Sequence, residues 1–542
     1  MPADKNARRN FLKSASAGIA STAAVSAAVF GLPLGGIAAV QSPVANSRVY
    51  DVTAFGARGD GRILDSPAIN KAIETAAAAG GGTISFPAGT YCCYSIHLKS
   101  HIALHLAPGA TILAADPPTD ASAPAYDLAE SNAPWESYQD FGHNHWHNSL
   151  IWGENLENIS IIGPGLIWGK GLSRGWGAGP KAETPGVANK AIALKNCRNV
   201  LLRDFSILHG GHFGILATGV DNLHIDSLKI DTNRDGMDID CCRNARVSNC
   251  SVNSPWDDAI CPKSSFAPGY ARATEFLTID NCYVTGAYEE GTLLDGTFKR
   301  FAPDDKVSRN GRIKFGTESN GGFRHITVSN CIFDGCHGLA LESVDGALLE
   351  DIVITNITMR DIVSAPIFMR LGSRMRGPTN VPVGTIRRIL ISNLTCSNAA
   401  SNVSSIISGI PDHPIEDIKL ENIVIQHQGG GAAENAWLQL SEKEKDYPEP
   451  NMFGTTPSHG FFLRHVKGIE MDGVKIISKE PDSRPAFVLD DVQGADFFQI
   501  KAADRQTPGV PVFSLKNVGD FSVARSKRVP DTEIDSVQKK EL

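Results

Sequence analysis

A strand-like phrase with alternating apolar residues recurs along most of this chain and constrains the fold more than any other feature. Where copies lie closest together, the anchoring residues Asn199, Asn222 and Asn244 are 23 and 22 residues apart (222 − 199 and 244 − 222). Copies begin at Asn155, Cys197, Val220, Cys242, Thr274, Phe323, Leu349, Ile386, Ile415 and Lys467. A repeat of about 22 to 30 residues that holds two or three short strands is typical of a solenoid of stacked coils.

The composition of the phrases favours strands over helices. Ile, Val and Leu alternate with polar residues, and Asn stands at the turns. The chain has 52 Gly but only 7% aromatic residues, which suits short strands and turns better than a helical bundle. Leucine-rich repeats are the main structural alternative, but their L-x-x-L-x-L period is missing. We therefore predict an all-β fold, a right-handed parallel β-helix.

One helix is expected, at the N-terminal end of the array. Residues 65–79 (DSPAINKAIETAAAA) combine an acidic N-cap, a proline in the first turn and apolar residues at helical spacing. A short capping helix at this position covers the apolar core that the first coil would otherwise expose.

The first 45 residues have the character of an export signal. Arg8-Arg9 and Phe11-Leu12-Lys13 precede a weakly apolar stretch rich in Ala, Gly and Ser, the pattern of a twin-arginine signal peptide. A membrane anchor is the alternative, although this composition makes a poor one. We expect the protein to use the twin-arginine export machinery, to function in the periplasm or as a secreted protein, and to have no stable membrane insertion.

The remainder reads as one domain. We predict a single β-helix domain over 46–530 and a flexible C-terminal tail over 531–542. Long loops that do not fit the repeat are expected near 116–147, 265–310 and 428–458. Long loops on one side of a rigid scaffold are where binding sites are commonly built.

Charge and cysteines exclude some classes of function. A net charge of −8 argues against a nucleic-acid partner. Of the eleven cysteines, Cys250, Cys282 and Cys331 each follow Asn within the repeated phrase. Equivalent positions in successive coils would form a buried ladder of reduced thiols; disulfides between them are the alternative.

Two acidic clusters carry the strongest chemical signal. Asp235 and Asp258 are 23 residues apart (258 − 235), one repeat, so the two side chains should stack about 4.8 Å from one another. Asp257 adds a third carboxylate. Such clustering raises the pKa of one carboxyl group while others stay ionised, which supplies both an acid and a base.

The motifs resemble glycoside hydrolase family 28, the polygalacturonases and rhamnogalacturonan hydrolases. Residues 55–61 (FGARGDG) resemble the start of pectin-active β-helix proteins. Residues 233–235 (NRD) match the family's N-T-D, residues 257–264 (DDAICPKS) match its D-D, and residues 316–322 (GTESNGG) match the tail of its G-H-G motif. The resemblance extends from about residue 49 to 400.

Two departures from the family pattern concern the substrate. Asn310-Gly311-Arg312 stands where the family has G-H-G, so the histidine is absent. The nearest candidate for the family's R-I-K is Phe368-Met369-Arg370. These changes point away from polygalacturonate itself and toward another uronate- or rhamnose-containing linkage.

The resemblance implies roles for the acidic residues. Asp257 would be the general acid, while Asp235 and Asp258 would hold the attacking water, which implies an inverting hydrolase. Polysaccharide or oligosaccharide is the expected partner. The predicted substrate-binding residues are Asn233, Lys263, Lys314, Arg312, Glu318 and Arg370.

Other interpretations remain open. The aspartates could cap turns of the β-helix. A calcium-dependent polysaccharide lyase on the same fold is a second possibility, and a non-catalytic glycan-binding β-helix is a third. We predict no cofactor and no metal site, and we expect ordinary loop or core roles for the histidines His143, His145, His147, His209 and His212.

Overall fold

The structure is a computed structural model that describes residues 48–542 except 120–122, 124, 176–178 and 503–508. The predicted signal peptide, 1–45, lies outside the described residues. Arg48–Leu542 form one compact unit. Within the described residues, no helix has the length and apolar character needed to cross a bilayer.

Strands dominate the chain. The first elements are β1 (Val49–Asp51), η1 (Val52–Phe55), β2 (Asp60–Leu64), α2 (Ser66–Ala78), β3 (Gly82–Phe86), β4 (Gly89–Cys93), β5 (Ile96–His97), β6 (Ile102–Leu106), β7 (Ala110–Ala114), η2 (Glu136–Tyr138), η3 (Phe141–His143), β8 (Ile151–Glu154), β9 (Glu157–Ile162) and β10 (Leu166–Trp168). The central coils contain β11 (Lys190–Lys195), β12 (Arg198–Arg203), β13 (Ser206–Leu208), β14 (Phe213–Thr218), β15 (Asp221–Asp226), β16 (Lys229–Asp231), β17 (Asp235–Asp240), β18 (Arg246–Ser248), β19 (Ser251–Asn253), β20 (Ile260–Lys263), β21 (Thr274–Glu275), β22 (Thr278–Asp280), β23 (Tyr283–Thr285) and β24 (Lys314–Phe315). The last coils contain β25 (Phe323–Ser329), β26 (Ile332–Asp334), β27 (Leu339–Ser343), β28 (Leu348–Arg360), β29 (Ile367–Leu371), β30 (Thr385–Ala399), β31 (Ser405–Ser408), β32 (Ile415–His427), η4 (Ala433–Trp437), η5 (Pro450–Phe453), β33 (Phe461–Asp472), β34 (Lys475–Ser478), β35 (Phe487–Phe498), β36 (Phe513–Ala524) and β37 (Thr532–Glu541).

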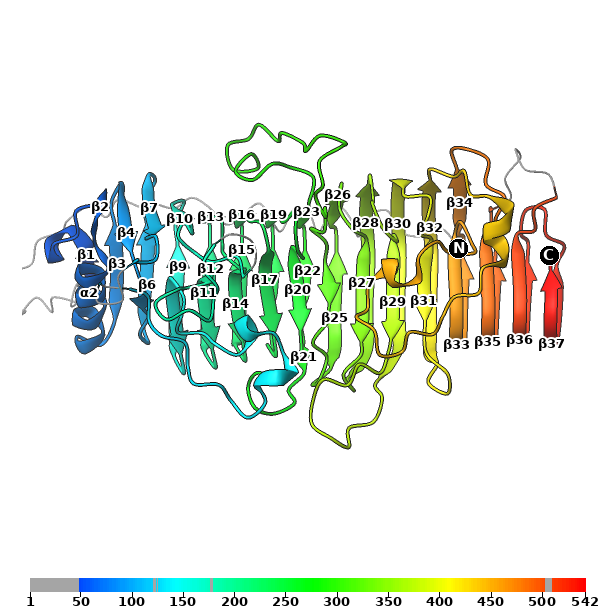
Figure 1. The fold of residues 1–542 in the computed structure, drawn as a ribbon, viewed down its shortest axis with the longest axis horizontal. Helices are drawn as coiled ribbons and strands as arrows, with labels where there is room; N and C mark the ends of the chain where they lie inside the picture. Colours follow the sequence, from blue (N-terminus) through cyan, green and yellow to red (C-terminus); the bar gives the residue numbers. More distant parts are fainter. Residues whose placement is uncertain (1–47, 120–122, 124, 176–178, 503–508) are drawn as a thin grey trace, which may run out of the picture. The chain divides into compact units, whose positions relative to one another are not determined.

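Successive coils pair in parallel and stack in sequence order from β1 to β36 (Figure 1). One sheet holds 31 strands, and a second, six-stranded sheet has the order β20-β17-β14-β11-β8-β5. Together with the solved structures compared below, this confirms the predicted right-handed parallel β-helix.

Asparagine fixes the turns between strands. Asn158, Asn199 and Asn222 have φ of 56°, 54° and 55°, in the left-handed region that Asn tolerates better than most residues. Their side chains form a ladder: Asn199 Nδ2 donates to Asn158 Oδ1 at 2.9 Å, and Asn222 Nδ2 donates to Asn199 Oδ1 at 2.8 Å. The repeated Asn in the sequence thus marks both a backbone conformation and a contact between coils.

The interior is a continuous stack of Ile, Leu, Val and Phe side chains. The cysteines share this core, and no disulfide joins any of the eleven. Cys250, Cys282 and Cys331 are buried and reduced, as predicted.

The two ends of the stack are closed differently. The predicted capping helix is α2, whose Ile69 and Ile73 are completely buried against the first coil. At the other end, the prediction of a flexible tail over 531–542 is wrong. Residues 532–541 form β37, which pairs antiparallel with β36 and covers the last coil's edge.

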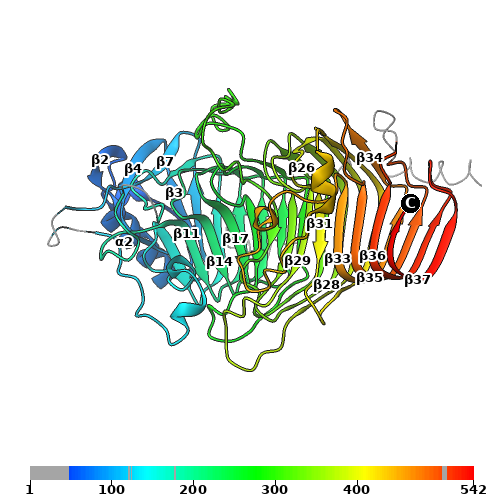
Figure 2. The ribbon, with the colours of Figure 1, turned by 45° about the vertical axis from the view of Figure 1, so that its right-hand side comes forward.

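Long segments connect some strands on the side of the six-stranded sheet, where β11, β14 and β17 lie side by side (Figure 2). Residues 115–150 join β7 to β8, residues 286–313 join β23 to β24, and residues 428–460 join β32 to β33. The second of these overlaps the predicted loop region 265–310, which also contains the short strands β21, β22 and β23.

Candidate active site

Three aspartates meet at the N-terminal edge of the six-stranded sheet, where β17 begins and just before β20. The register of β17 and β20 pairs Met237 with Ile260, which stacks Asp235 on Asp258. Gly236 N donates to Asp258 O at 2.9 Å across the same two coils. One carboxylate oxygen each of Asp235, Asp257 and Asp258 lies within 4.8 Å of the others.

Two buried cations surround Asp258. Lys314 Nζ lies 2.6 Å from Oδ2, and Arg312 Nε donates to Oδ1 at 2.9 Å. All three side chains are at most 3% exposed. Burial alone would raise the pKa of Asp258, but Lys314 and Arg312 outweigh it and hold the pKa well below its usual range. Asp258 is therefore ionised.

Asp235 has the opposite environment. Burial, with the charges of Asp257 and Asp238 close by, raises its pKa well above the usual value. Its Oδ1 is buried without a hydrogen-bond partner in the described structure. Asp257 is more exposed and pairs with Arg234, whose Nη2 lies 2.9 Å from Oδ2. A proton on Asp235 and a charge on Asp258 give the cluster an acid and a base.

A second buried network lies beside this cluster. Lys263 Nζ donates to Glu318 Oε2 at 3.0 Å, and His143 Nε2 lies 3.3 Å from Asp238 Oδ2. Burial lowers the pKa of His143, but Glu318 and Asp238 outweigh it, so the pKa is raised. Since His143 belongs to η3 in the 115–150 segment, this network fastens that segment to β17 and β20.

The 428–460 segment covers the other side of Asp258. Glu449 forms an ion pair with Arg312. Thr317 Oγ1 donates to Tyr447 Oη at 2.8 Å. Below them, burial raises the pKa of Glu342 to about 8, and neither of its carboxyl oxygens has a hydrogen-bond partner among the described residues.

These contacts change the expected role of three predicted substrate-binding cations. Lys263, Arg312 and Lys314 are buried and paired with acidic residues of this chain. They therefore stabilise the buried carboxylates of the site by ion pairing. Glu318 likewise forms an ion pair with Lys263. Asn233 is buried and is among the groups that lower the pKa of Glu290.

Arg370 lies apart from the aspartate cluster. β24 pairs with β27 and β27 pairs with β29, so Arg370 lies two coils beyond Lys314. Its guanidinium donates to Ser408 Oγ at 2.8 Å and to Glu442 O at 2.6 Å. Arg370 is 1% exposed, and its contact with Glu442 ties it to the 428–460 segment.

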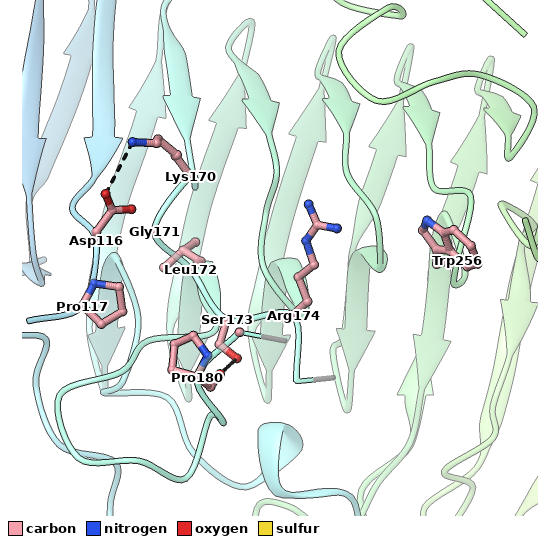
Figure 3. Close-up of a pocket in the computed structure, with 10 residues that line it drawn as sticks. Asp116, Pro117, Lys170, Gly171, Leu172, Ser173, Arg174, Pro180 and Trp256 are labelled. Atoms are coloured by element: carbon pink, nitrogen blue, oxygen red, sulfur yellow. Dashed lines mark hydrogen bonds and ion pairs between the residues drawn. The ribbon is translucent and has the colours of Figure 1, made fainter. Parts of the chain in front are cut away.

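A pocket of about 480 Å³ opens on the N-terminal side of the cluster. It is lined by Lys170, Arg174 and Trp256, among others, and Figure 3 shows Arg174 between Lys170 and Trp256. The side chains of Lys170 and Arg174 are 53% and 47% exposed. Arg234, which pairs with Asp257, also donates to Arg174 O at 3.3 Å, which connects pocket and cluster.

Several residues of the site carry little or no signal in the sequence. Asp238 had a usable signal, because the DGMDID of β17 alternates acids with the core residues Met237 and Ile239. Tyr447 and Glu449 had none, since they come from a segment outside the repeat.

Comparison with known proteins agrees with the resemblance. Residues 49–116 match the family described as rhamnogalacturonase A/epimerase, pectate lyase-like, and residues 190–376 match the right-handed beta helix region. A probable polygalacturonase of Vitis vinifera is 25% identical over 406 residues, covering 66% of this chain and 78% of the relative. An exo-poly-alpha-D-galacturonosidase of Dickeya chrysanthemi is 24% identical over 415 residues, covering 66% of this chain and 64% of the relative, slightly less than two thirds.

Among solved structures, a family 28 exopolygalacturonase of Yersinia enterocolitica has a TM-score of 0.59 at 18% identity. The match covers 89% of this chain and 79% of that one. The fold is shared, and the predicted resemblance to family 28 is confirmed.

Proposed function

We propose that this chain, which resembles the family 28 polygalacturonases in sequence and fold, is a glycoside hydrolase acting on a pectin-like polysaccharide or oligosaccharide. The observation that carries the proposal is the placement of Asp235, Asp257 and Asp258 within 4.8 Å, with opposite pKa shifts on Asp235 and Asp258. Turn capping does not require three carboxylates to lie this close together, whereas acid–base cleavage of a glycosidic bond does require paired carboxyl groups.

Exposure and charge assign the roles. Asp257 is the most exposed of the three and lies next to the pocket, so it protonates the leaving oxygen. Asp258 accepts a proton from the attacking water. In the free protein Asp235 carries the proton, because Asp257 pairs with Arg234. When substrate binds, this proton passes from Asp235 to Asp257.

Inversion at the anomeric carbon is proposed from the resemblance. The short separation of the carboxylates is an argument for retention of the anomeric configuration. Retaining hydrolases have carboxyl groups about 5–5.5 Å apart, and inverting ones about 6.5–9.5 Å. Water held jointly by Asp235 and Asp258 favours inversion, because Lys314 and Arg312 pair with Asp258 and make it a weak nucleophile.

The substrate proposed is a uronate- or rhamnose-containing linkage. Lys170 and Arg174 are the exposed cations of the pocket, suited to a sugar carboxylate, and Trp256 offers an apolar face to a sugar ring. On the other side of the cluster, Glu449 neutralises Arg312. A uronate is therefore expected on the pocket side and a neutral sugar on the Glu449 side.

We also propose export through the twin-arginine pathway to the periplasm or the medium, based on Arg8-Arg9 and Phe11-Leu12-Lys13. Replacing both arginines by lysine is expected to leave precursor in the cytoplasm. An unchanged exported fraction would refute this part of the proposal.

The deciding experiment incubates the purified protein with polygalacturonate, rhamnogalacturonan and defined oligosaccharides. New reducing ends are measured, and NMR follows the anomer formed first. We expect saturated products with inverted configuration, and loss of turnover in Asp257→Asn. A retained anomer would overturn the water-mediated mechanism; full turnover in Asp257→Asn would overturn the assignment of the site.

A calcium-dependent lyase is the second candidate, favoured by the fact that Asp235, Asp257 and Asp258 are close enough to hold one cation. A lyase would give unsaturated products that absorb in the ultraviolet and would lose activity with a chelator. Glycan binding without product of either kind would instead favour a non-catalytic protein.

A further inference from the structure

A second group of ligand-type side chains lies away from the aspartates, where the 115–150 segment meets β8. One ligand atom each of Glu130, His147 and Glu154 lies within 4.8 Å of the others. His147 Nε2 is 3.1 Å from Glu154 Oε2 and 3.5 Å from Glu130 Oε1. A tetrahedral zinc ion with bonds of about 2.0–2.1 Å requires ligand atoms about 3.3–3.4 Å apart. The two separations fall on either side of that value.

A neighbouring histidine gives an independent indication of a missing ligand. His145 is completely buried, and its Nδ1 has no hydrogen-bond partner in the described part of the chain. This nitrogen lies 3.9 Å from Glu130 Oε2. Its other nitrogen, Nε2, contacts Glu136 Oε1 at 3.2 Å, an acid–histidine contact of the kind that fixes the tautomer of metal-ligating histidines.

The surrounding side chains hold the group in place. The ring of His147 stacks on Trp152 with centroids 4.0 Å apart. Both carboxylate oxygens of Glu130 accept from Trp146 N, at 3.1 and 2.9 Å. Lys195 pairs with Glu154 Oε1 at 3.0 Å and leaves Oε2 directed to His147. Prior orientation of this kind lowers the entropy cost of binding an ion.

We propose that Glu130, His147 and Glu154 bind one divalent transition-metal ion, zinc being the best match, with His145 as a fourth ligand or as a partner of a bound water. The imidazole favours zinc over calcium or magnesium, which prefer oxygen ligands alone. The ion joins residues of the 115–150 segment to β8. It is therefore a structural ion that stabilises the segment carrying His143 into the aspartate site.

The test uses full-length protein treated with a chelator, dialysed, and titrated with zinc chloride by calorimetry, with bound metal counted by elemental analysis. We expect one zinc per chain and a higher melting temperature with zinc. His147→Gln and Glu154→Gln should each weaken binding by at least about 100-fold, above the 10–100-fold typical of outer-shell changes, and should abolish the thermal shift.

A matched control comes from His465, which also lies between two carboxylates. Its Nδ1 contacts Asp491 Oδ2 at 2.6 Å and its Nε2 contacts Glu442 Oε2 at 3.2 Å, so opposite nitrogens face the two acids and one ion cannot join them. His465→Asn should bind zinc like the parent chain. Circular dichroism verifies that the variants fold. The proposal fails if the parent chain binds no zinc, or if folded His147→Gln and Glu154→Gln bind as much as His465→Asn.

Discussion

Lys314 Nζ lies 2.6 Å from Asp258 Oδ2, and the two side chains are 3% and 1% exposed. Because Asp258 pairs with two buried cations, Lys314 and Arg312, it stabilises the fold in addition to its proposed catalytic role. This pairing changes what substitution of Asp258 should do, because it removes the partner of two buried charges.

Asp258→Asn should lower both turnover and stability. Loss of a general base typically costs about 10²–10⁴ in rate. Breaking a buried ion pair by removing one partner costs about 3–5 kcal/mol, since Lys314 would lose its buried ion-pair partner and Arg312 would keep only Glu449.

Chemical denaturation and rate measurements on the same preparation check this prediction. Because the pKa of Asp258 is lowered in the folded state, its contribution is present above the ordinary pKa of 3.8 and disappears as the pH falls through the lowered value. Unchanged stability of Asp258→Asn at neutral pH would contradict the pairing.

Asp235→Asn should separate rate from stability. Burial raises the pKa of Asp235, so ionising it in the folded state is unfavourable at any pH above its ordinary value. The amide removes this penalty. We expect a higher melting temperature at neutral pH, no gain near about pH 3 where the carboxyl is protonated in both states, and a loss in rate of about 10²–10⁴. A lower melting temperature with activity retained would indicate a turn-capping residue.

His143 should make stability depend on pH in the opposite sense to Asp258. Glu318 and Asp238 raise its pKa above 6.5 despite burial. Its stabilisation is therefore complete below about pH 6.5 and is lost as the pH rises through the raised value. His143→Gln should lower the melting temperature more at about pH 5.5 than at about pH 9. Equal losses at both pH values would mean that the charge of His143 does not contribute.

Cys282→Ala tests the core ladder. Cys282 is buried and reduced between coils that also carry Cys250 and Cys331. The small cavity should cost about 1–2 kcal/mol without altering turnover, since Cys282 lies between β22 and β23 of the larger sheet and the aspartates lie at β17 and β20 of the six-stranded sheet. Urea unfolding measures the cost, and alkylation after denaturation should label all three cysteines in the parent chain. Disulfides mapped among them would refute the assignment.

The sequence predicts features that follow from the coil length and fails where other segments intervene. The stacking of Asp235 on Asp258 was predictable, because one repeat of spacing fixes the neighbour in the next coil. The position of Arg370 was not, because loops of different length make residue counting an unreliable guide to the coil number. Glu449 contacts Arg312 across 137 residues of sequence, and no period in the chain encodes that contact. The strand β37 was missed because it follows the last repeat and pairs antiparallel.

Arg174→Met should test whether the pocket recognises a carboxylate. Its guanidinium is 47% exposed and lies 3.4 Å from Glu290, while Arg234 contacts the backbone of Arg174 and leaves the side chain to the pocket. Loss of a charge-assisted hydrogen bond of about 1.5–3 kcal/mol should raise KM for a uronate-containing oligosaccharide roughly 10- to 150-fold by the usual conversion. We expect kcat to change little, because the ion pair between Asp257 and Arg234 remains.

The control substrate is the same oligosaccharide with its carboxylates methyl-esterified. If Arg174 binds a uronate, the ester should already have a high KM that the variant scarcely changes. Arg203→Met is a matched control variant: Arg203 is the last residue of β12, its side chain is 45% exposed and pairs with Asp204, and it does not line the pocket. An equal rise in KM for acid and ester would show that Arg174 shapes the pocket without reading charge, and the uronate would then have to bind elsewhere in the cleft.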